Sequence, residues 1–250
     1  MKAEILIPTE LSDIWLKTYQ EFIKVADNSN DDIFICEKMV QIFCGIHLKE
    51  VAQIRWADVQ HIVNKVNEAF SQKPKFQKRF KIKGVEFGFI PDLENISFGE
   101  YIDLTENIKD LKDMHKAMAV MYRPITESSK DKYEIEPYVS STNYAEVMKY
   151  ATIDIALGAK VFFWNLHKKL SKSTLVFLEK EMMTKEMQTI LAKEVSLEKL
   201  GGGIPQFMLS LKATLSDLEK LQKFPYKTAL HGSLLKSKKQ ILKMVRYNEN

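Results

Sequence analysis

The sequence predicts a mainly α-helical fold: a helical bundle with a small inserted β-hairpin or ribbon and an extended C-terminal arm. Three observations support this. Apolar residues recur at helical spacing over most of the 250 residues, two short central segments alternate apolar and polar residues, and basic residues gather near the C-terminus. The hydrophobic fraction of 45% and the charged fraction of 28% are typical of a globular chain that buries its own core.

Residues 1–72 are predicted to form an N-terminal helical region. Thr9, after Pro8, is a plausible N-cap for the first helix, and Gly45 is expected to end the second. The predicted helices cover residues 10–27, 33–43, 48–54 and 57–70.

The two cysteines, Cys36 and Cys44, fall on the same predicted helix. At a rise of about 1.5 Å per residue their backbones lie about 12 Å apart, too far for a disulfide between them. Two free thiols favour a reducing compartment.

Residues 73–106 are predicted to hold the β insert. Residues 80–83 alternate apolar and basic side chains. Gly84 interrupts this pattern, and an alternating pattern resumes over residues 85–90. This pattern favours a small hairpin or ribbon. Pro91 and Asp92 favour a turn after it.

Residues 107–203 are predicted to form a central helical body. A helix is expected from Asn107 to about Pro124, with Met114, Met118 and Met121 in its core stripe. A polar surface loop over 126–142 and a capping-box-like start at Asn143 follow. Two more helices are expected, to about Leu170 and over 175–200, before the break at 201–205. The apolar stretch 153–166 contains charged residues, so a buried helix is expected and not a membrane span.

Residues 204–250 are predicted to form a short helix and a basic docking arm. From Lys220 to the C-terminus eight Lys or Arg residues stand against one acid, whereas the remaining chain has 29 bases and 32 acids. Apolar residues at 241, 242, 244 and 245 would let this arm dock as an amphipathic helix on nucleic acid or an acidic protein surface. The candidate partner-binding residues are Lys236, Lys238, Lys239, Lys243 and Arg246.

No catalytic, cofactor or metal site is expected. The five histidines have no HExxH-type spacing, and the glycines at 201–203 lack the Lys-Ser/Thr of a P-loop. Glu100 and Asp103 lie three residues apart near an expected helix start, where carboxylates commonly serve capping and helix-dipole roles. We therefore expect a protein that is not an enzyme.

Two patterns leave nucleic-acid binding open. The helices 33–43 and 57–70 resemble a helix-turn-helix, with Arg55, Gln60, Asn64, Lys65 and Asn67 as candidate base-reading residues. Residues 76–83 interleave aromatic and basic residues, which suits either phosphate and base contacts or the protection of a sheet edge.

The block 87–93, 96–104 and 115–125 resembles virion proteins of tailed bacteriophages that infect Bacteroidetes, of the crAss-like kind. It reads FGFIPDL, ISFGEYIDL and HKAMAVMYRPI. The resemblance implies a neck or tail ring protein, an adaptor that stacks on the portal as a symmetric ring with helical bodies and extended arms. The resemblance does not identify which residues of this chain would make those contacts.

The resulting hypothesis is a non-enzymatic ring or adaptor component of the head–tail connector. It would be located in the virion, assembled in the host cytoplasm, and would bind itself, the portal and other neck or tail proteins, with possible non-specific contact to packaged DNA and none to a membrane. Tyr101, Tyr122 and Arg123 are expected to brace the central fold. The alternatives are a DNA-binding helix-turn-helix regulator and a tail-assembly chaperone.

Overall fold

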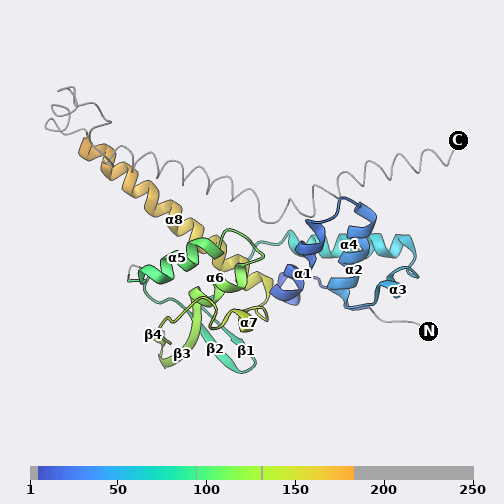
Figure 1. Cartoon of the computed structure of the whole chain (residues 1–250), viewed down its shortest axis with the longest axis horizontal. Helices are drawn as coiled ribbons and strands as arrows, with labels where there is room; N and C mark the ends of the chain where they lie inside the picture. Colours follow the sequence, from blue (N-terminus) through green and yellow to red (C-terminus); the bar gives the residue numbers. More distant parts are fainter. Residues whose placement is uncertain (1–4, 94, 131, 183–250) are drawn as a thin grey trace. The chain divides into compact units, whose positions relative to one another are not determined.

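The computed structural model describes residues 5–93, 95–130 and 132–182. Within them the chain forms eight α-helices, one short 3-10 helix and four β-strands (Figure 1). The chain divides into two units between Lys160 and Val161, and the first unit contains the whole sheet and every helix that precedes α8. Among the described helices, none combines the length and hydropathy that crossing a membrane requires.

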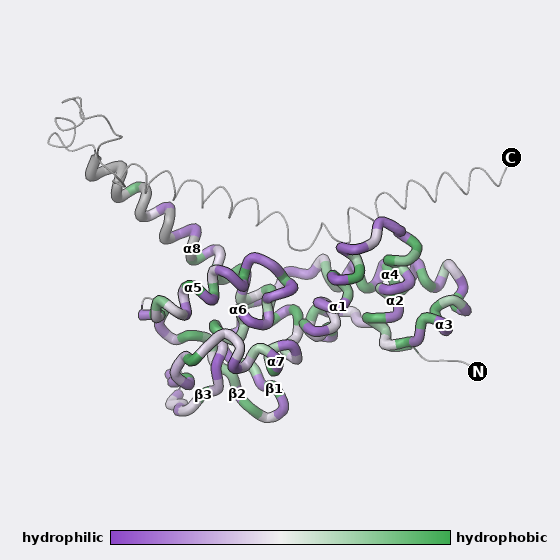
Figure 2. The backbone as a smooth tube through the Cα atoms, viewed as in Figure 1, coloured by the Kyte–Doolittle hydropathy of each residue, from purple (hydrophilic) through white to green (hydrophobic). Residues whose placement is uncertain are grey.

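The N-terminal elements are η1 (Leu11–Asp13), α1 (Leu16–Ala26), α2 (Asp32–Cys44), α3 (Leu48–Val51) and α4 (Trp56–Phe70). Figure 2 shows hydrophobic and hydrophilic stretches alternating along α2 and α4, as expected for helices with one buried face. The ring of Phe43 lies 5.0 Å from that of Phe22 and 5.4 Å from that of Phe70, which joins α2 to α1 and α4.

Local chemistry explains the ends of α2. Asp31 Oδ1 accepts hydrogen bonds from the backbone amides of Ile33 and Phe34, at 3.0 and 3.2 Å. Gly45 ends the helix with φ of 66°, in the left-handed region that glycine adopts readily. The predicted helix and its glycine stop are confirmed. The predicted start of the first helix at Thr9 is wrong, because η1 and the extended Trp15 come before α1.

The four strands form one antiparallel sheet in the order β1-β2-β3-β4. They are β1 (Arg79–Ile82), β2 (Val85–Phe89), β3 (Tyr122–Ser129) and β4 (Lys132–Ile135). Lys83 and Gly84 connect β1 to β2, and both have positive φ, as a tight two-residue hairpin turn requires. The predicted hairpin is confirmed.

The fold class is α+β, so the prediction of a mainly α-helical fold with one small hairpin is wrong. β3 and β4 lie where the sequence predicted the end of a helix and a polar loop. The second half of β3 is exposed and polar, and a bulge falls between Ile125 and Glu127. These two features remove the alternation of apolar and polar residues by which a strand is recognised.

The remaining helices are α5 (Phe98–Asn107), α6 (Met114–Met121), α7 (Ala145–Met148) and α8 (Ile153–Met182). A turn at 108–113 takes the place of the first part of the helix expected from Asn107, although the methionines of α6 are buried as predicted. The cap of α7 is Tyr144 and not Asn143. The expected break after Leu170 is absent, since the run Ser171 to Thr174 contains neither glycine nor proline and α8 continues through it.

The linker between α4 and β1 is held against α8 and β3. The hydroxyl of Tyr122 donates to the carbonyl of Gln77 at 2.7 Å, and Gln77 Nε2 donates to Asp154 Oδ2 at 2.9 Å. A side chain at Gly158 of α8 would begin 2.4 Å from the carbonyl oxygen of Lys75. Only glycine therefore permits this approach of the linker to the helix.

Tyr133 of β4 packs against β2 of the sheet. Its ring occupies the space above Gly88 in β2, where an added Cβ would lie 2.4 Å from Tyr133 Cε2. Its hydroxyl donates to the carbonyl of Phe89 at 2.7 Å. The Arg79 guanidinium stacks on this ring, at 4.4 Å from its centroid. An aromatic ring thus fills the gap left by a strand glycine.

Several sequence expectations lie outside the described residues. They are the part of the helix expected over 175–200 that follows Met182, the glycines 201–203, the helix near 206–222, and the basic arm with Lys236, Lys238, Lys239, Lys243 and Arg246.

Candidate protein-docking surface

The first turn of α5 is fixed by a capping box. Ser97 Oγ accepts from the amide of Glu100 at 3.2 Å, and Glu100 Oε2 accepts from the amide of Ser97 at 2.7 Å. Two backbone donors that the helix leaves unpaired are thereby satisfied. The capping role predicted for Glu100 is confirmed.

Glu100 also pairs with Arg123 at the start of β3. Glu100 Oε1 lies 2.7 Å from Arg123 Nη1, and both side chains are more than nine-tenths buried. Burial acts to raise the pKa of Glu100, but the hydrogen bonds from Ser97 and the Arg123 guanidinium outweigh it and hold that pKa below its ordinary value. The buried pair joins the N-terminus of α5 to the sheet.

Asp103, one turn further along α5, forms hydrogen bonds with the segment that follows β4. Its Oδ2 accepts from the hydroxyl of Tyr138 and from the amide of Ser141, the latter at 3.2 Å. These bonds lower the pKa of Asp103. The ring of Tyr138 lies 5.6 Å from the Arg123 guanidinium. The segment 138–141 is consequently held along α5.

This buried network leaves apolar side chains on the outside. Phe98 is 77% exposed, Tyr101 is 44% exposed, and Val139 is 76% exposed. Phe98 and Tyr101 stand three residues apart on one helix and therefore share a face. Val139 follows Tyr138, whose ring lies against Gly99. We call Phe98, Tyr101, Val139 and the exposed Glu106 the α5 surface.

The prediction that three residues brace the central fold is correct for two of them. Tyr122 and Arg123 are buried, whereas Tyr101 is exposed and belongs to the α5 surface.

The setting of the α5 surface is acidic. Between Lys83 and Lys109 the sequence has no Lys or Arg and six acids: Glu86, Asp92, Glu94, Glu100, Asp103 and Glu106. The segment that leads to Tyr138 adds Glu134 and Glu136. Arg123 neutralises only the buried Glu100. A partner that covers the α5 surface would therefore need apolar side chains and positive charge.

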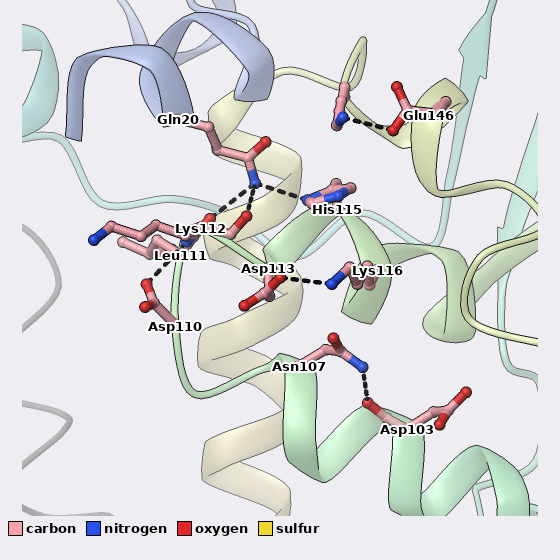
Figure 3. Close-up of polar contacts among 11 residues, drawn as sticks. Gln20, Asp103, Asn107, Asp110, Leu111, Lys112, Asp113, His115, Lys116 and Glu146 are labelled. Carbon is pink, nitrogen blue, oxygen red and sulfur yellow. Dashed lines mark hydrogen bonds and ion pairs between the residues drawn. The ribbon is translucent and has the colours of Figure 1, made fainter. Parts of the chain in front are cut away.

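A second polar cluster joins α1 to the turn at 108–113. Gln20 Nε2 donates to the carbonyls of Leu111 and Lys112 at 2.9 and 3.0 Å and lies 3.0 Å from His115 Nδ1. Figure 3 shows Gln20 pointing into this turn, with His115 beside it. Burial lowers the pKa of His115, and Lys149 and Lys116 lower it further. The cluster provides donors for part-buried carbonyls and has the character of a structural joint.

Lys160 of α8 is buried behind the same turn. Its Nζ donates to the carbonyl of Lys109 at 3.3 Å. Burial lowers its pKa to about 8, although Asp110 opposes the shift. Within the described residues, no group of three potential metal ligands gathers around this lysine or elsewhere.

A third cluster is basic and aromatic. The rings of Trp15 and Tyr150, both exposed, meet edge to face at 6.3 Å. Lys83 lies 4.6 Å and Lys17 lies 6.0 Å from the centroid of Tyr150. This surface has the opposite charge to the α5 surface.

The predicted nucleic-acid residues lie in less suitable positions. Phe80 is buried and stacks on Phe87, so its face cannot stack on a base. β1 is an edge strand, which suits the edge-protecting interpretation of its lysines. Arg55, the N-cap residue of α4, pairs with Asp58, and Lys65 on α4 pairs with Glu68, each at 2.8 Å.

The α5 surface escaped the sequence analysis because its residues come from two segments. Ser97 and Glu100 form a recognisable capping box, and this signal alone could have located the helix. The approach of Val139 depends on the hydrogen bonds of Asp103, which no local pattern specifies.

Comparisons of this chain with protein-family models, with curated proteins and with solved structures return no match.

Proposed function

We propose that this chain is a non-enzymatic structural protein of a phage particle, a ring or adaptor component of the head–tail connector. The observation that carries the proposal is the α5 surface, where Phe98 and Val139 expose about three quarters of their area in an acidic setting. Aromatic residues exposed together in this way favour a protein partner that removes them from water.

The sheet and the charge distribution also support assembly. β1 and β4 are the two ends of the sheet, so each has one side open to a further strand among the described elements. The acidic α5 surface and the basic C-terminal arm are complementary patches at different places on one chain. Such patches make head-to-tail contacts, and rotation can close these contacts into a ring.

The resemblance to phage virion proteins supplies the biological setting. The resembling segments, 87–93, 96–104 and 115–125, contain most of β2, α5 and α6 and the start of β3, together with Glu100 and Arg123. In this proposal the protein is assembled in the host cytoplasm and becomes part of the virion. Its partners are further copies of itself, the portal, and adjacent neck or tail proteins.

The proposal is tested by the mass of the purified full-length protein, measured by light scattering with and without residues 220–250. A large closed oligomer that depends on these residues, or a monomer that assembles on a portal protein, is the expected result. A stable dimer that binds duplex DNA in a sequence-specific, salt-dependent manner would overturn the proposal and favour the regulator. Absence of the protein from purified particles would favour an assembly chaperone.

A further inference from the structure

We infer that the α5 surface of one copy binds the C-terminal segment 234–246 of a second copy. The inference rests on the proposed function, because it names the contact through which neighbouring copies associate. The chain itself thus supplies the segment that covers the exposed face of α5.

The apolar side chains of the two partners match. The segment 234–246 has the sequence LLKSKKQILKMVR, in which apolar pairs at 234–235 and 241–242 are followed by Val245. In a helix these positions fall on one side, because they are spaced seven and then three to four residues apart. That stripe would cover Phe98, Tyr101 and Val139, whose exposed area is otherwise in contact with water.

The charges match as well. The segment carries five basic residues and no acid, and the α5 surface stands in a stretch of chain that has six acids and no base. The other exposed aromatic pair, Trp15 and Tyr150, is flanked by Lys17 and Lys83 and would repel the segment. Charge complementarity therefore selects the α5 surface over this alternative.

The chain is long enough for the contact. Residues 183–233, the 51 residues between the end of α8 and the segment, can span at most about 170 Å when fully extended. A segment bound to a neighbour links copies head to tail, whereas a segment bound to its own chain would link none.

Photo-crosslinking of the full-length protein tests the contact directly. The photoreactive residue p-benzoylphenylalanine replaces Phe98, which is exposed, so the substitution leaves the core intact. Light and heavy isotope-labelled chains are mixed before illumination, and cross-linked peptides are identified by mass spectrometry. We expect position 98 to join residues 234–246, with light-to-heavy pairs among the products.

Ile33 on α2 provides the matched control. It is 58% exposed and lies beside Asp31 and Asp32, so it combines an apolar side chain with acidic neighbours. The photoreactive residue at position 33 should give no more than background cross-linking to 234–246. Equal cross-linking from both positions would overturn the inference, because it would show charge attraction without a specific site.

Charge substitutions test the same contact in solution. Phe98→Lys should raise the dissociation constant for self-association about tenfold, as loss of one central interface residue typically does. Ile33→Lys should leave the constant unchanged. Glu106→Lys should weaken association, and the double change Lys239→Glu, Lys243→Glu in the same chain should restore part of it.

The outcomes separate this inference from the proposed function. A large oligomer without cross-links from position 98 to the segment refutes the inference and leaves the connector proposal standing. Cross-links confined to light-to-light and heavy-to-heavy pairs refute binding to a second copy. A DNA-binding dimer without these cross-links refutes both.

Discussion

Gly88 shows how one missing side chain shapes the sheet. Tyr133 lies over it, and the Arg79 guanidinium stacks on the same ring, so the three residues join β1, β2 and β4. The tyrosine hydroxyl adds a hydrogen bond to the carbonyl of Phe89. An added methyl group at position 88 would meet the ring at 2.4 Å and force it outward.

Gly88→Ala is expected to destabilise the protein by about 1–3 kcal/mol, the usual cost of overpacking. Urea unfolding followed by circular dichroism measures the change. Gly99→Ala is the control, because its new Cβ would stand 3.7 Å from Tyr138, at ordinary contact distance, and alanine favours a helix. Similar loss in both variants would contradict the role assigned to Tyr133.

Glu100 and Arg123 form a buried pair whose two members depend on each other. Glu100→Ala leaves the Arg123 guanidinium buried without its counter-charge and is expected to cost about 3–5 kcal/mol. Chemical unfolding of this variant, compared with Glu106→Ala on the exposed side of α5, measures the difference. A cost no larger than that of Glu106→Ala would show that the pair contributes nothing to stability.

The same carboxyl groups predict how stability changes with acid. The pKa values of Glu100 and Asp103 lie below their ordinary values of 4.5 and 3.8. Their contribution is therefore fully present above the ordinary values and is lost as the pH falls toward the lowered ones. Melting temperatures measured from pH 7 to pH 3 should fall less steeply for Glu100→Gln than for the unmodified protein.

Among the elements, the turn between α5 and α6 depends on a side chain from α1. Gln20 pairs with two of its carbonyls, and Lys160 pairs with a third. A buried carbonyl without a donor costs about 1–3 kcal/mol. The turn is thus stabilised by residues that lie far away in the sequence.

Gln20→Leu is expected to lower the unfolding free energy by about 2 kcal/mol or more, because it removes the donor from both carbonyls. Denaturant unfolding measures the loss. The matched control is Gln53→Leu, since Gln53 is exposed and should change stability little. An equal effect of the two substitutions would contradict the role of Gln20.

Sequence patterns predicted the elements whose signals are local. α2 has an aspartate cap and a glycine stop, and β1 and β2 have clear alternation around Gly84. β3, β4 and the 108–113 turn lack such local signals. Tyr133 of β4 packs over Gly88 of β2, and Gln20 of α1 bonds to the turn, so both contacts join residues far apart in the sequence. The α5 surface could be predicted only in part, from the Ser97 and Glu100 capping box.

At the scale of the whole molecule, opposite charges lie in different parts of one chain. The C-terminal 31 residues carry eight bases and one acid, and the stretch 84–108 carries six acids and no base. Exposed charges attract more weakly as salt concentration rises. Assembly that uses these regions should respond to salt while the fold of each copy does not.

The mean mass of the assembled protein is expected to fall as salt is raised from about 0.05 to 0.5 M, because the Debye length shortens over this range. Light scattering measures the mass, and circular dichroism over the same series checks that the fold is unchanged. A mass that stays constant or rises with salt would indicate association through apolar contacts alone.

Chemical modification of Lys160 can be used to measure local opening of this protein. The Lys160 pKa of about 8 leaves an appreciable fraction of the amine uncharged near neutral pH, and therefore nucleophilic, while the fold shields it from reagents. An acylating reagent added in large excess can modify it only when the 108–113 turn and α8 separate. The rate of that modification, followed by peptide mass spectrometry, would report how often the joint opens.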